Sequence, residues 1–279
     1  MNSGIIRGRY VIAEPLGKSR WHVIENGAVV HAAGRIVAVG SAADLMRMHP
    51  DLPVLGDDNT VVIPGMVNAH HHVGLTPLQM GTGDLPLELW TVARVKTRDI
   101  DIYLDTLYSA FEMIASGVTA VQHIRVSNLG SPEQALNSSR ECIRAYQDIG
   151  MRVSYALGVR DKNHLHHQMD DALFLDLLPE HLRAGAAGHM ARFGVGMEQL
   201  FEIFHVLSSD YAEADGVRVQ LAPPNLHWLS DRALEAYAEV GARTGTCMHM
   251  HLCETASQKE YARQRGGGTA VDYLERFGL

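Results

Sequence analysis

The chain has 279 residues, of which 46% are hydrophobic and 20% are charged, and its formal net charge is −8. This is an ordinary globular composition, and its acidic balance offers no basic surface for nucleic acid or for an anionic membrane. No apolar run approaches the length of about 20 residues that a membrane span needs, and no basic-then-apolar start resembles a signal peptide.

The first 59 residues contain short apolar runs, each bounded by glycine or by charged turns. The runs are Tyr10-Val11-Ile12, His22-Val23-Ile24, Gly27 to Val30 and Arg35 to Val39. This pattern predicts a small amino-terminal domain of the β-sandwich type over residues 1–59.

From residue 60 onward, apolar strands alternate with amphipathic helices, which is typical of parallel βα units. We expect strands near 61–67, 118–124, 151–158, 217–222 and 246–252. Helices are expected near 100–116, 133–149, 190–207, 231–243 and 256–276, with long loops at 129–134 and 161–171. The sequence therefore predicts an α/β domain over residues 60–279 with about five βα units.

A histidine triplet, His70-His71-His72, ends the first of these strands. Side chains alternate faces along a strand, so His70 and His72 point the same way and His71 points the other way. Two neutral imidazoles fixed on one rigid element are good ligands for a borderline metal such as zinc. A polar loop that is merely rich in histidine is the alternative interpretation.

The last predicted strand also ends in histidine, at His251, and Glu254 follows three residues later. A metal that activates water needs a nearby group that takes the proton and delivers it to the leaving group. We therefore interpret His251 as a third metal ligand and Glu254 as the general acid/base. A His-x-x-Glu motif alone is a weak signal, and its pairing with the distant His-x-His gives it weight.

Together, Pro64 to His72 and His251-Leu252-Cys253-Glu254 resemble the amidohydrolase superfamily, in the branch of cytosine, guanine and adenosyl-homocysteine deaminases and triazine hydrolases. The segments Gly34 to Gly40, Asp84 to Trp90 and Ser116 to Ala120 are also similar to that branch. The resemblance implies a (β/α)8 barrel of the TIM type. It also implies one divalent metal, held by the His-x-His of strand 1, a histidine of strand 5 and an aspartate of strand 8.

Active-site residues of such barrels lie at the carboxyl ends of the strands. His123, Arg160 and His227 fall at such ends, and Asp84 belongs to a segment that matches the family, so these four are candidate substrate-binding residues. His227 resembles the family's strand 4 histidine, which contacts the substrate ring. A core role for His123 and a solvated position for Arg160 remain open.

Several other residues invite a metal or catalytic reading that we consider weaker. His249 is expected to fill the barrel interior, and His164, His166 and His167 to lie in a solvated loop. The three cysteines, Cys142, Cys247 and Cys253, suit a reducing cytoplasm, and the last two are interpreted as packing residues. Residues 217–222 contain no lysine, which favours one metal ion over a lysine-bridged pair. Zn²⁺ is the expected ion, and Fe²⁺ tolerates the same ligands.

The resemblance implies a hydrolase of EC 3.5.4 type that deaminates or dechlorinates a nitrogen heterocycle, such as an aminopurine, aminopyrimidine or aminotriazine. Hydroxide generated at the metal would attack a ring carbon, with water and the heterocycle as the small-molecule reactants. Hydrolysis of another C–N bond, in an amide or formimino group, is an alternative. A non-catalytic scaffold or an inactive truncated product is another.

A complete barrel takes about 250 residues by itself, and the barrel here begins only near residue 60. The family's strand 6 histidine and strand 8 aspartate have no counterpart in this sequence. We therefore expect the chain to be the amino-terminal part of a longer protein, which as a whole is expected to form a homo-oligomer.

Overall fold

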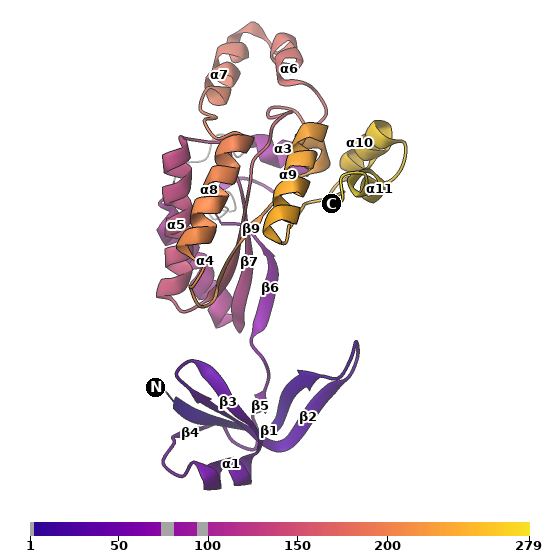
Figure 1. Ribbon diagram of the computed structural model, residues 1–279. Helices are drawn as coiled ribbons and strands as arrows, with labels where there is room; N and C mark the ends of the chain where they lie inside the picture. The colour runs from indigo at the N-terminus through magenta and orange to yellow at the C-terminus, as the bar shows by residue number, and fades with distance from the viewer. Residues whose placement is uncertain (1–2, 74–80, 94–99) are drawn as a thin grey trace. The chain divides into compact units, whose positions relative to one another are not determined.

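The computed structural model describes residues 3–73, 81–93 and 100–279 (Figure 1). The chain divides into two compact units, Met1–Met66 and Val67–Leu279. In the described ranges, no helix has the length and the apolar character that crossing a membrane requires.

The first unit is built on one sheet in the order β3-β2-β1-β4, with β5 also paired to β1. Its elements are β1 (Ser3–Pro15), β2 (Trp21–Ala32), β3 (Arg35–Ser41), α1 (Ala42–Met48), β4 (Val54–Leu55) and β5 (Val61–Val62). Apolar side chains of the sheet pack against α1 and form a small core of Ile5, Ala28, Val30, Ala42 and Leu45. Where the sequence predicted a two-layer sandwich, the described residues of this unit form a single five-stranded sheet.

The strand predicted at 61–67 is two strands that belong to different sheets. β5 pairs in parallel with β1, whereas β6 (Met66–His71) is the first strand of the second sheet. Between them lies Pro64-Gly65, and proline has no N–H to donate to a strand ladder. The apolar run was therefore correctly read as extended chain, but the proline divides it.

The second unit contains a four-stranded sheet in the order β6-β7-β8-β9 (Figure 1). β7 (Val118–Val126), β8 (Arg152–Gly158) and β9 (Val217–Leu221) pair in parallel. The strand predicted at 246–252 is not formed. That segment makes a single parallel bridge, Leu221 to Met248, and one backbone hydrogen bond from His249 to Leu221 (3.0 Å), so it runs beside β9 without a continuous ladder.

Helices follow the strands, and several of them begin at a residue whose side chain caps the helix. They are α3 (Leu87–Ala93), α4 (Ile102–Ala115), α5 (Pro132–Asp148), α6 (Asp171–Leu177), α7 (Glu180–Met190), α8 (Met197–Asp210), the 3-10 helix η2 (Leu226–Trp228), α9 (Asp231–Thr244), α10 (Ala256–Gly266) and α11 (Ala270–Glu275). The hydroxyls of Ser131, Ser230 and Thr255 accept N–H bonds at the starts of α5, α9 and α10.

Two helix predictions were wrong in extent. The helix predicted at 190–207 begins only at Met197. Two helices that were not expected from the sequence, α6 and α7, precede it. The helix predicted at 256–276 is divided into α10 and α11, because Gly267 takes a left-handed conformation (φ 74°) that ends α10.

The two faces of the second sheet differ in what covers them. The larger core lies between the sheet and the helices, where Val121, Val153 and Leu157 meet side chains of α5 and α8. On the opposite face, Ile124 and Ala156 join Ala222 in a small apolar cluster. His70 and His72 lie on the face that carries this small apolar cluster.

At the carboxyl end of β8, Gly158 permits a close approach to the next strand. A Cβ atom on Gly158 would overlap the carbonyl oxygen of Ala222. We expect Gly158→Ala to destabilise the fold by about 1–3 kcal/mol, as overpacking commonly does. Gly185→Ala on α7 is the control, because nothing lies within 4 Å of that Cβ, and it should be neutral or slightly stabilising. Urea unfolding of both variants measures the difference, and equal midpoints would contradict it.

Candidate metal centre

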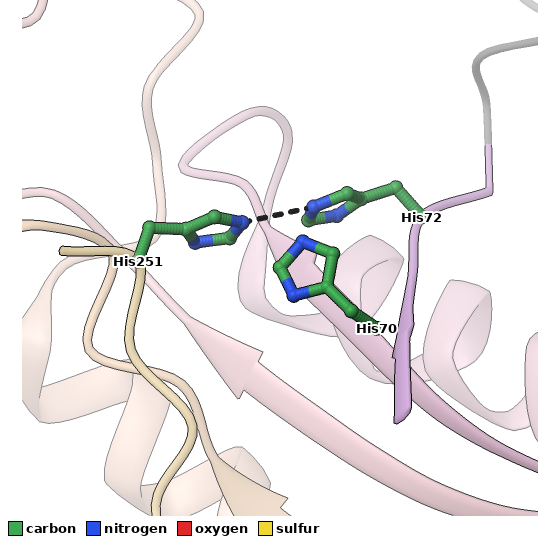
Figure 2. Close-up of side chains that lie close together, drawn as sticks. All are labelled: His70, His72 and His251. Carbon is green, nitrogen blue, oxygen red and sulfur yellow. Dashed lines mark hydrogen bonds between the residues drawn. The ribbon is translucent and has the colours of Figure 1, made fainter. Parts of the chain in front are cut away.

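Three imidazole rings converge at the end of β6, as Figure 2 shows. His70 lies in β6, His72 follows that strand, and His251 comes from the segment beside β9. One ligand nitrogen from each of the three lies within 4.8 Å of the others. The His70 and His72 rings point the same way, with centroids 5.0 Å apart, as strand alternation predicts.

The hydrogen bonds of these rings show which nitrogens are available. His72 Nδ1 lies 2.8 Å from the carbonyl oxygen of Ile124, which can only accept, so Nδ1 carries the proton. His251 bonds the backbone of Pro224, which likewise can only accept. Each neutral ring thus donates its proton to a carbonyl, and the two Nε2 atoms face each other at 2.9 Å.

Two nitrogen lone pairs that face each other repel unless a proton or a metal ion binds them. A proton is disfavoured there, because burial and then the neighbouring His70 and His249 rings lower the pKa of His251 to about 4. A divalent metal satisfies both lone pairs, and carbonyl-oriented imidazoles are the usual ligands of such ions. The donor set of His70, His72 and His251 therefore fits a zinc-type metal.

His71 lies on the other side of β6, as predicted, and His123 is on that side too. The two ring centroids are 6.2 Å apart. His123 is 1% exposed and its Nδ1 lies 3.1 Å from the hydroxyl of Tyr146 on α5. His123 is thus a histidine of the helix-side core, which was the alternative role considered for it, and the structure does not bring it to the three-histidine cluster.

His249 was expected to fill the barrel interior, but it contacts the metal-site cluster. Its Nε2 lies 3.0 Å from Nδ1 of His70. Burial and then His70 lower the pKa of His249, which keeps the ring neutral. The sequence carried a signal for this contact, because His249 and His251 have the same His-x-His spacing as His70 and His72.

Glu254 lies three residues beyond His251 and is exposed. Cys253, just before it, has a left-handed backbone (φ 55°), which is uncommon for a residue with a Cβ and turns the chain sharply. The Glu254 carboxylate lies 3.4 Å from the side-chain amides of Asn225 and Gln258. Both Cys247 and Cys253 are exposed, so their assignment as packing residues was wrong.

His227 and Arg160 lie together in a second cluster. His227, in η2, is 1% exposed, and its ring centroid lies 4.8 Å from that of His167. Arg160 stacks on Trp228, with its guanidinium carbon 3.4 Å from the ring centroid. His167, predicted to be solvated, is half-buried, and the Glu254 carboxylate is among the charges that influence its pKa. His227 therefore lies beside His167, which is within electrostatic reach of Glu254.

Two remaining candidates lie elsewhere. Asp84 is exposed in the segment before α3. His164, which was predicted to be solvated, has only 15% of its side chain exposed and lies 2.9 Å from an Asp171 carboxylate oxygen. This hydrogen bond ties the loop after β8 to the start of α6.

Burial lowers the pKa of His227 to about 2, against about 6.5 in an unfolded chain. Below pH 6.5 the unfolded state binds the proton and the folded state does not, so this contribution to stability is present at neutral pH and is lost as the pH falls. We expect the free energy of unfolding to decrease more steeply between pH 6 and 4.5 in the parent than in His227→Gln. The difference should be about 1.4 kcal/mol per pH unit. Urea titrations of the metal-free protein at several pH values measure it, and identical slopes would refute it.

Comparison with protein families gives two matches. A model described as "Amidohydrolase family" matches residues 61–279. A second, described as "Imidazolonepropionase-like composite domain, bacteria", matches residues 27–51. The first match covers well over half of the chain and includes all three clustered histidines and Glu254.

Curated relatives are deaminases. A 5-methylthioadenosine/S-adenosylhomocysteine deaminase from Thermodesulfovibrio yellowstonii is 22% identical over 99% of this chain and 55% of its own length. An 8-oxoguanine deaminase from Pseudomonas aeruginosa is 28% identical over 90% of this chain and 53% of its own length. The chain thus spans about half the length of the curated relatives it matches.

Solved structures share the fold. A mutant atrazine chlorohydrolase from Arthrobacter aurescens, complexed with zinc and atraton, has a TM-score of 0.74 at 18% identity, over 98% of this chain and 58% of that one. An adenosine deaminase from Xanthomonas campestris with bound zinc has a TM-score of 0.70 at 20% identity, over 99% and 55%. At these identities the structural similarity shows a shared fold but does not identify a substrate.

Proposed function

Because the chain belongs to the amidohydrolase family, we propose that it forms part of a metal-dependent hydrolase that deaminates or dechlorinates a nitrogen heterocycle. The family resemblance seen in the sequence is confirmed by the match to residues 61–279. The observation that carries the proposal is the convergence of three imidazoles with two lone pairs aimed at one point.

His70, His72 and His251 would hold one divalent metal, with Zn²⁺ favoured and Fe²⁺ compatible with the same ligands. When bound, such an ion makes water a strong nucleophile near neutral pH. The solved structures of the related chlorohydrolase and the related adenosine deaminase contain zinc, which supports this choice of ion.

Glu254 would take the proton of the attacking water on a carboxylate oxygen and then deliver it to the departing amine. A carbon flanked by ring nitrogens is a suitable electrophile, because those nitrogens accept the developing negative charge. Arg160 and His227 border Glu254's neighbour His167, and we propose that they contact the ring or its oxygen substituents. Asp84 stays a candidate from the sequence alone.

For the whole protein we propose a (β/α)8 barrel preceded by a small amino-terminal β domain, with the division near residue 59. The parallel strands β7, β8 and β9 with their connecting helices support the barrel. The fold likeness to the chlorohydrolase supports it as well. We also propose that the whole protein is a homo-oligomer and lies in the cytoplasm.

A substrate panel tests the function. The purified, zinc-loaded whole protein is incubated with an aminopurine, an aminopyrimidine, an aminotriazine and a chlorotriazine, and ammonia and chloride release are measured. We expect release from at least one heterocycle, abolished by a chelator and restored by Zn²⁺. Hydrolysis of cyclic amides or formimino compounds alone would contradict deamination and identify a different C–N hydrolase.

A further inference from the structure

Two buried amide side chains surround Glu254. Asn225, at the start of η2, is 1% exposed, and Gln258, in the first turn of α10, is 4% exposed. Buried amides are costly unless their hydrogen bonds are satisfied. Their partners therefore show what these two residues do.

The orientation of the Asn225 amide is fixed by its oxygen. Asn225 Oδ1 accepts the backbone N–H of Leu226 at 2.8 Å, so Nδ2 must be the atom on the other side. Nδ2 donates to Gln258 Oε1 at 2.9 Å and approaches Glu254 Oε2 at 3.4 Å. Asn225 can therefore act toward Glu254 only as a donor.

The orientation of the Gln258 amide follows in the same way. Gln258 Oε1 accepts from Asn225 Nδ2 and, at 2.8 Å, from the backbone N–H of Glu254. Its Nε2 is thereby turned toward Glu254 Oε2, which it approaches at 3.4 Å. Gln258 thus holds both ends of Glu254, the backbone through its oxygen and the carboxylate through its nitrogen.

We propose that Asn225 and Gln258 are positioning residues that hold Glu254 by one carboxylate oxygen, Oε2, and leave Oε1 to carry the proton in the reaction. The inference rests on the proposed acid/base role of Glu254. Within the described part of the chain, the hydrogen bonds to this carboxylate go to Oε2.

Such a restraint has a physical purpose here. Glu254 is exposed and follows the sharp turn at Cys253, so its side chain would otherwise sample several rotamers. Proton transfer requires the carboxylate within hydrogen-bond reach of the reacting atoms. Two donors on Oε2 select one rotamer, and because both are uncharged they do so without adding a cation beside the histidine cluster.

The test compares Gln258→Met with Gln264→Met in the zinc-loaded protein. Gln264 lies on the same helix and bonds only an exposed Glu260 carboxylate among the described residues (2.9 Å), so it is a matched control. We expect Gln258→Met to lower kcat about tenfold, the usual effect of losing a supporting hydrogen bond, with KM and zinc content unchanged. A normal kcat in Gln258→Met would overturn the proposal.

A second substitution guards against simple misfolding. Gln258→Glu keeps an oxygen that accepts from Asn225 and from the Glu254 backbone, but it cannot donate to Oε2 when ionised. We expect the same loss of kcat and a lowered but still cooperative thermal transition, because a second carboxylate is buried beside Glu254. In crystals of either variant the Glu254 carboxylate should leave its position, whereas Gln264→Met should leave it in place. An unmoved carboxylate in Gln258→Glu would overturn the proposal independently of any turnover measurement.

The double variant separates this inference from the proposed function. If Gln258 acts through Glu254, adding Gln258→Met to Glu254→Gln should cost less than about twofold, because the two residues work as one unit. A further tenfold loss would mean that Gln258 acts elsewhere, and the positioning role would be wrong while the acid/base role stands. Normal turnover in Glu254→Gln alone would reject the acid/base role and, with it, the positioning role.

Discussion

In the whole protein, replacing His70, His72 or His251 by alanine is expected to remove zinc and activity together. Each variant deletes one of the nitrogens that lie within 4.8 Å of one another, and a site left with two imidazoles loses both affinity and geometry. We expect zinc per chain, measured by elemental analysis after gel filtration, to fall from about one to below a tenth. Turnover should fall by the same factor.

His71→Ala is the matched control, because it removes the same side chain from the next position of the strand. The His71 ring lies on the far side, near His123, so it contributes packing and not ligation. Zinc content should stay near that of the parent, with a modest loss of thermal stability. If His71→Ala lost zinc as fully as His70→Ala, the face assignment along β6 would be wrong.

Period-two alternation was enough to predict the essential geometry of the cluster. It separates His70 and His72 from His71, and the rings lie as expected from that rule alone. The pairing of His251 with these two was expected from its own strand end and from the family resemblance, since no local rule relates residues 179 positions apart. The proximity of the three histidines was thus predicted from two strand ends and one family motif, and their role as metal ligands stays a proposal.

What the sequence did not predict depends on partners that are distant along the chain. Asn225 and Gln258 are separated by 33 positions, and neither stands in a motif, so their contact with Glu254 appears only in three dimensions. The role of His123 stayed open because strand ends place residues on both faces, and only the contact with Tyr146 shows that its side chain lies on the helix-covered face. The sequence locates a strand's end but not which face each helix covers.

The local errors also have identifiable causes. The run at 61–67 reads as one strand by hydrophobicity, but Pro64 interrupts the ladder and β5 finds its partner in β1. The segment at 246–252 has the composition of a strand, yet it contributes one bridge to β9. In both cases tertiary pairing, not composition, decided the outcome.

Glu254→Gln is expected to lower kcat by about 10² or more while substrate affinity and zinc content stay near those of the parent. The substitution keeps the shape of the side chain and an oxygen that can accept from Asn225 and Gln258, but the amide can neither take nor return a proton. Timed assays of ammonia or chloride release compare Glu254→Gln with the parent, and zinc is measured on the same samples. Glu260→Gln on α10 is the control, because Glu260 bonds Arg263 on the surface of that helix. Turnover within a few-fold of the parent in Glu254→Gln would remove Glu254 from the mechanism and move the search for the proton carrier to its half-buried neighbour His167.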